Sequence, residues 1–110
     1  MGYSQHWKLD RELTEKEIHD LITEAVKVCS RATADGVKVD MVIDADYLII
    51  NDERKLSESF IIKWREHGWQ HCKTFRSPFD SVVVSILLYM KENGWTAQSD
   101  GGKLIVGKTY

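Results

Sequence analysis

The chain has 110 residues, 43% of them hydrophobic, and its 15 Lys and Arg against 17 Asp and Glu give a formal net charge of −2. This length and apolar content predict one compact domain over residues 1–110, large enough to bury a single core. The near-neutral charge excludes a general attraction to duplex nucleic acid or to an anionic membrane.

No apolar run approaches the roughly 20 residues that a membrane-spanning helix needs. The first residues lack the apolar block of a signal peptide, and Cys29 and Cys72 lack the spacing of metal ligands. We therefore expect a cytoplasmic protein with two reduced thiols, no metal and no cofactor.

Residues 7–9 predict a short first strand. Thr14 and Glu17 have the spacing of a capping box, in which each side chain accepts a free amide at a helix start. Apolar residues then recur at helical spacing, which predicts a helix with one apolar face over about residues 15–32. These residues are Ile18, Leu21, Ile22, Ala25, Val26 and Cys29.

Two short apolar runs, residues 39–43 and 47–50, predict a hairpin that turns at residues 44–46. Residues 57–64 predict the next strand. The stretch 69–75 predicts another, and alternation along it assigns its side chains to two faces. One face carries Trp69, His71, Lys73 and Phe75, and the other carries Gln70, Cys72 and Thr74.

The second helix is expected to begin directly after that strand. Ser77, Pro78 and Asp80 fit its N-cap, N1 and N3 positions. The free amides and the positive helix end would attract an anion, and Lys73 and Arg76 just upstream would reinforce that attraction. Alternatively, Asp80 itself fills the anion's place and both cations are solvated surface charges.

The predicted second helix, about residues 78–93, is apolar around most of its circumference. Such a helix is either buried on more than one side or packed against a second subunit, so a homo-oligomer through this helix is expected. Gly94 suits the helix end. Residues 95–98 and 103–106 predict a closing hairpin.

The pattern β-α-ββββ-α-ββ predicts an α+β fold, with two helices against a mostly antiparallel sheet of about five to seven strands. Its consecutive strands between residues 39 and 75 are expected to form a meander.

The segment Cys72-Lys73-Thr74-Phe75-Arg76-Ser77-Pro78-Phe79-Asp80 resembles a group of small phage and bacterial proteins that carry Cys-Lys-Thr-x-Arg-x-Pro-Tyr-Asp. Phe79 replaces the tyrosine, so any role of that hydroxyl is absent. The similarity extends in order over most of the chain, through residues 7–9, 13–14 and 58–60. It implies a phage-related or bacterial intracellular setting and no established activity.

Our first hypothesis is a phage-type, non-enzymatic protein that sequesters a phosphorylated nucleotide or cyclic oligonucleotide, such as an immune signal of the host. Lys73 and Arg76 would hold phosphate at the second helix, and Trp69 could stack on a base. The full predicted ligand-binding set is Trp69, His71, Lys73, Thr74, Arg76, Ser77 and Asp80.

Two alternatives stay open. The tryptophans and the apolar second helix also suit a protein–protein interaction module, such as an inhibitor of a host factor. His71 could instead act as general base in a metal-independent phosphodiesterase, with Lys73 and Arg76 stabilising charge. No nucleophile elbow or phosphate loop supports catalysis, so the sequence favours a binding protein and assigns no catalytic residue.

Overall fold

Six strands and two helices follow one another in the order β-α-β-β-β-β-α-β in a computed structural model that describes residues 3–110. The strands are β1 (Ser4–Leu9), β2 (Val39–Ile43), β3 (Tyr47–Asp52), β4 (Phe60–Lys63), β5 (Gly68–Lys73) and β6 (Thr96–Ser99), and the helices are α1 (Glu15–Ala34) and α2 (Phe79–Glu92). All strand pairs are antiparallel. The predicted α+β class is therefore confirmed.

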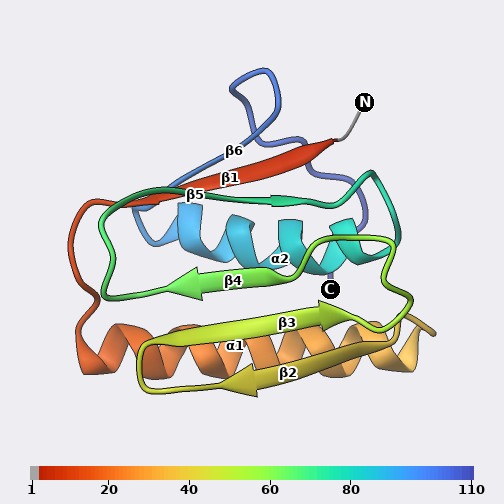
Figure 1. Cartoon of the computed structure of the whole chain (residues 1–110), viewed down its shortest axis with the longest axis horizontal. Helices are drawn as coiled ribbons and strands as arrows, with labels where there is room; N and C mark the ends of the chain where they lie inside the picture. Colours follow the sequence, from red (N-terminus) through yellow and green to blue (C-terminus); the bar gives the residue numbers. More distant parts are fainter. Residues whose placement is uncertain (1–2) are drawn as a thin grey trace.

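The strands form two three-stranded sheets, a first sheet in the order β5-β1-β6 and a second in the order β2-β3-β4. Figure 1 shows the strands crossing the molecule in the sequence β2, β3, β4, β5, β1, β6, with α1 behind β2 and β3 and α2 beside β4 and β5. The expected meander is correct for β2 to β4 and wrong for β5, which pairs with β1 instead. The β1–β5 pairing joins segments that are far apart in the sequence, so the residues of either strand alone do not predict it.

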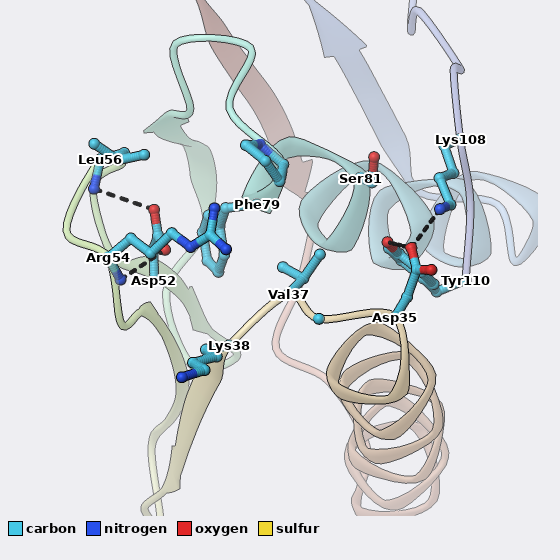
Figure 2. A pocket seen from close by; sticks show the side chains of 12 residues that line it. Asp35, Val37, Lys38, Asp52, Arg54, Leu56, Phe79, Ser81, Lys108 and Tyr110 are labelled. Carbon is cyan, nitrogen blue, oxygen red and sulfur yellow. Dashed lines mark hydrogen bonds and ion pairs between the residues drawn. The ribbon is translucent and has the colours of Figure 1, made fainter.

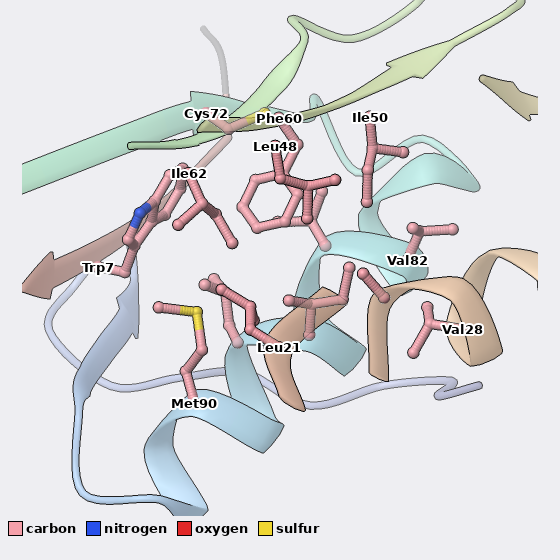
Figure 3. Close-up of a cluster of buried hydrophobic side chains, with 14 of the residues drawn as sticks. Trp7, Leu21, Val28, Leu48, Ile50, Phe60, Ile62, Cys72, Val82 and Met90 are labelled. Carbon is pink, nitrogen blue, oxygen red and sulfur yellow. The ribbon is translucent and has the colours of Figure 1, made fainter. Parts of the chain in front are cut away.

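Both helices pack on the same side of the strands. Figure 3 shows Leu48 and Ile50 of β3 meeting Leu21 of α1 and Val82 of α2, all fully buried. The Trp7 ring packs edge-on against the Phe60 ring of β4, with 4.9 Å between the centroids.

Helix α2 is buried within a single chain. Eight of its residues are buried, and the C-terminal segment also packs against it, since the Tyr110 N–H donates to the Ser85 Oγ at 2.8 Å. Lys91 and Glu92 in its last turn are exposed. Burial within one chain therefore accounts for the apolar residues around α2. A homo-oligomer through α2 is not needed to explain them, and it stays a prediction.

The closing hairpin forms only in part. The sequence predicts a strand over residues 103–106, whereas only β6 is present and residues 103–106 are irregular. Gly101 and Gly102 have φ of 94° and 93°, so the chain bends away from β6. Two hydrogen bonds connect this segment to Ser99 of β6. The Ser99 N–H donates to the Lys103 carbonyl, and the Ile105 N–H donates to the Ser99 Oγ.

None of the helices in residues 3–110 combines the length and apolar composition required to cross a membrane.

The start of α1 confirms the capping box. The Glu17 N–H donates to the Thr14 Oγ1 at 3.2 Å, and the Thr14 N–H donates back to the Glu17 Oε1 at 2.9 Å. Arg11 adds a bidentate pair to the same carboxylate at 2.6 and 2.7 Å. The hydrogen bonds from Arg11, followed by the one from Thr14, lower the pKa of Glu17 from 4.5 to about 2.

We expect Glu17→Gln to lower the free energy of unfolding by about 1 kcal/mol at pH 7. Because the folded-state pKa lies below the unfolded one, this contribution is complete above about pH 4.5 and disappears as the pH falls towards 2. Urea unfolding of both proteins at several pH values measures the difference. Glu15→Gln, in the same helical turn, is the control and should change stability little. A difference that persists at pH 2 would contradict the assignment.

Candidate functional site

The start of α2 does not form the predicted cap. Pro78 is the N-cap residue, its backbone is helical, and no side chain caps the helix. The Ser77 Oγ lies 2.6 Å from the Ser57 Oγ instead. The prediction of Ser77 as N-cap with Asp80 reaching back to it is therefore wrong. A tight turn before the helix, closed by the Ser77 N–H on the Thr74 carbonyl at 2.9 Å, redirects the chain.

Two predicted ligand-binding residues belong to a polar network between α2 and the first sheet. Thr74 is fully buried, and its hydroxyl donates to the Asp80 Oδ1 at 2.5 Å. The Gln5 Nε2 donates to the same oxygen at 2.8 Å, and the Gln5 Oε1 accepts from the Ser99 Oγ at 2.7 Å. Gln5 and Ser99 are also fully buried. Thr74 and Asp80 thus connect secondary-structure elements, because their polar atoms already satisfy one another.

The other side of the first sheet carries three of the predicted residues. Trp69, His71 and Lys73 are exposed on β5, whereas Cys72 between them is fully buried. This burial pattern confirms the alternation predicted from the sequence. Trp69 is 53% exposed, whereas Trp7 and Trp64 are buried in the core.

Strand β1 places two further residues beside them. His6 pairs across the strands with His71, and Lys8 pairs with Trp69. The two histidine rings have centroids 6.1 Å apart. We call the surface formed by Trp69, His71, Lys73, His6 and Lys8 the open face, since both helices lie on the other side of the strands (Figure 1). Sequence reasoning missed His6 and Lys8 as site residues, because only the β1–β5 pairing brings them here.

Carboxylates orient part of the open face. The His6 Nε2 lies 2.9 Å from the Asp100 Oδ1, and the Ser4 N–H donates to the other oxygen at 2.9 Å. The hydrogen bond with His6, then that with Ser4, lowers the pKa of Asp100. Glu58 binds the backbone N–H of Lys73 at 2.8 Å. In residues 3–110 the Lys73 ammonium has no carboxylate within ion-pair distance.

A groove separates the open face from the second sheet. At this boundary the Gln70 side chain replaces strand pairing: its Oε1 accepts the Lys63 N–H at 3.0 Å, and its Nε2 donates to the Lys63 carbonyl at 3.1 Å. The resulting groove has a volume of about 280 Å³. Its lining is mostly polar and charged, and the two large apolar side chains in it are Ile61 and Trp69.

The predicted Arg76 lies at the end of the first sheet, in the turn that precedes α2. Phe75 and Arg76 have φ of 53° and 57°, which is costly for residues other than glycine, about 1–2 kcal/mol each. Phe75 is 51% exposed, and the Arg76 guanidinium lies 4.4 Å from the centroid of the Tyr3 ring. The turn therefore holds two large exposed side chains in strained backbone.

A second cavity, also of about 280 Å³, opens beside the start of α2 (Figure 2). Neither Lys73 nor Arg76 lines it. Its cations include Lys108, which pairs with Asp35, and the Tyr110 hydroxyl donates to the same carboxylate at 2.7 Å. Bonds from Lys108, then Tyr110, lower the pKa of Asp35. Lys38 and Arg54, the other two cations of this cavity, belong to no ion pair within residues 3–110, so the cavity also offers positive charge.

Within residues 3–110, no three His, Cys, Asp or Glu side chains are grouped so that they could hold a metal ion. Both thiols are buried, and burial raises the pKa of Cys29 to about 11 and that of Cys72 to about 12. Neither thiol is therefore a reactive thiolate at neutral pH.

The fold and the open face together define a small two-layer α+β protein with an aromatic and cationic sheet surface. Comparisons with protein-family models, with curated proteins and with solved structures gave no match for this chain.

Proposed function

We propose that this chain is a non-enzymatic binding protein for a phosphorylated nucleotide or short oligonucleotide, which it holds on the open face. The observation that carries the proposal is the alignment of an exposed Trp69 with His71 and Lys73 on an uncovered strand. An aromatic side chain offers a stacking surface for any base, worth about 1–3 kcal/mol per base, while a neighbouring cation offers a partner for phosphate.

The spacing along β5 supports this assignment. Alternate residues of a strand lie about 6.5–7 Å apart, so Trp69 and Lys73 are separated by roughly 13 Å. That span accommodates a base over the indole and phosphate groups near His71 and Lys73. The groove between Ile61 and Trp69 would receive the edge of the base, and Arg76 lies at the far end of the same sheet.

The local charge also favours an anion, although the whole chain is slightly acidic. Lys73 and Arg76 have no ion-pair partner in residues 3–110. In the phage-related setting implied by the resemblance, such a protein would sequester a nucleotide signal of the host.

The experiment that tests the proposal is recovery of a bound ligand. Protein purified from bacterial cells is denatured by heat, and the supernatant is analysed by mass spectrometry, with Lys73→Ala/Arg76→Ala prepared in parallel. Intact nucleotide released from the unaltered protein and depleted in the double variant is the expected result. Equal recovery from both proteins would contradict the role of these cations.

One observation favours a second function, metal-independent cleavage of a ribonucleotide phosphodiester. His6 and His71 lie side by side, and Asp100 orients His6. One histidine would remove the proton of the ribose 2′-hydroxyl, whose oxygen attacks phosphorus, and the other would protonate the departing 5′-oxygen. The products are a 2′,3′-cyclic phosphate and a 5′-hydroxyl, and no metal is required.

Product analysis separates the two functions. A short RNA incubated with the protein and resolved by chromatography stays intact if the protein only binds. Cleavage that is lost in His6→Asn and in His71→Asn, while the RNA still binds, would establish the second function in place of the first.

A further inference from the structure

The cavity beside the start of α2 lies where four segments of the chain meet (Figure 2). They are residues 35–38 between α1 and β2, residues 52–56 from the end of β3, residues 78–81 at the start of α2, and residues 108–110. None of the lining residues belongs to the open face. The volume of about 280 Å³ is close to the lower end of small-molecule pockets, about 300–1,000 Å³, so a ligand with a single ring suits its size.

Both acidic side chains of the lining already have partners within the chain. Asp35 accepts a hydrogen bond from the Tyr110 hydroxyl at 2.7 Å and forms an ion pair with Lys108. Asp52 is almost fully buried, and its two carboxylate oxygens each accept a backbone N–H of the following turn. Neither carboxylate therefore needs a cation from a ligand.

Two cations of the lining have no such partner. Neither Lys38 nor Arg54 has a carboxylate within ion-pair distance in the described part of the chain. Figure 2 shows the Arg54 side chain directed into the cavity, towards Phe79. A guanidinium is always charged, and its planar fork of N–H donors matches the two oxygens of a carboxylate or a phosphate. An unpaired fork inside a cavity thus favours an oxyanion as the polar group of the ligand.

The backbone that carries Arg54 is anchored in the fold. The Asp52 carboxylate accepts the Arg54 N–H and the Leu56 N–H, each at 3.1 Å. The Lys55 N–H donates to the Asp52 carbonyl at 2.8 Å, which closes the turn. A side chain on an anchored turn loses less conformational freedom when it binds than one on a loose loop.

The remaining wall of the cavity is largely apolar. Its apolar groups are Val37, Leu56, Pro78, Phe79 and the ring of Tyr110. Leu56 is 54% exposed, so a ligand that covered it would remove apolar surface from water. The ligand is therefore expected to join its charged group to an apolar body.

We infer that this cavity binds a small oxyanion with an apolar single-ring body, either a carboxylate or a phosphate monoester. Arg54 binds the oxygens of the charged group, Lys38 adds positive charge, and the apolar wall packs against the ring. The site goes beyond the proposed function and does not depend on it, since the open face shares none of its residues.

Amide chemical shifts of isotope-labelled protein, followed by NMR during titration, test this site. The probes are phenylacetate and phenyl phosphate, with the neutral phenylacetamide for comparison. We expect saturable shifts at residues 35–38, 52–56 and 78–81 with at least one anion, and at least tenfold weaker binding of the amide. The anion that binds more tightly decides between a carboxylate and a phosphate ester.

One variant tests the role of the guanidinium. Arg54→Gln should bind the anion about tenfold more weakly or worse, because a hydrogen bond to a charged group contributes about 1.5–3 kcal/mol. Its circular dichroism spectrum should not change, since Arg54 is exposed. Lys55→Gln is the matched control: Lys55 is exposed on the same turn and does not line the cavity, so this variant should bind like the unaltered protein.

Four results would overturn the inference. They are the absence of saturable shifts with both anions, shifts confined to the open face, equal affinity for the neutral amide, and an Arg54→Gln variant that binds as tightly as the unaltered protein or the Lys55→Gln control weakened to the same degree.

Discussion

Replacing Asp80 with alanine is expected to lower the free energy of unfolding by about 2–4 kcal/mol, since two buried donors would lose their acceptor. The Asp80 Oδ1 receives hydrogen bonds from both Gln5 and Thr74, which are fully buried. These bonds connect α2 to β1 and to the end of β5. Equilibrium unfolding in urea, followed by circular dichroism, measures the loss.

Two controls separate this network from general effects at the helix start. Asp80→Asn keeps an oxygen acceptor in the same position and should retain most of the stability, whereas Ser81→Ala alters the next residue and should have little effect. If the alanine variant at position 80 lost less than about 0.5 kcal/mol, a value usual for neutral surface changes, the network would not connect these elements as described.

Replacing Trp69 with alanine is expected to weaken nucleotide binding about tenfold or more, because base stacking contributes about 1–3 kcal/mol. Folding stability should change little, since the side chain is 53% exposed. Fluorescence anisotropy of a labelled short oligonucleotide, titrated with each protein at fixed low salt, measures the affinity.

Leu56→Ala is the control for the loss of an exposed apolar side chain, because Leu56 is 54% exposed outside the open face. It should leave binding unchanged. Equal affinity of the unaltered protein and the Trp69 variant would show that the ligand does not use the indole.

The elements with strong local signals could be predicted from the sequence. The capping box at Thr14 and Glu17, the hairpin of β2 and β3, and the alternation along β5 each depend on neighbouring residues, and the structure confirms all three. The strand predicted over residues 103–106 is absent, because a short apolar run such as Leu104 to Val106 fits a strand and also an irregular segment.

The site could be predicted only in part, for a physical reason. Trp69, His71 and Lys73 share a face through the two-residue period of one strand, which the sequence displays. Thr74 and Asp80 belong instead to a polar network with Gln5, and Gln5 also binds Ser99, so the network joins residues from the two ends of the chain. The same long-range β1–β5 pairing brings His6 and Lys8 to the open face, so two of its five residues depend on contacts that no local pattern encodes.

Calorimetric titration with a panel of nucleotides is the most direct test of the open face as a binding surface. The panel consists of AMP, ADP, ATP and cyclic dinucleotides, each added to the unaltered protein and to the double variant His71→Ala/Lys73→Ala. We expect saturable heat from at least one compound and at least tenfold weaker binding by the double variant. Absence of heat with every compound, or equal affinity of the two proteins, would contradict the account.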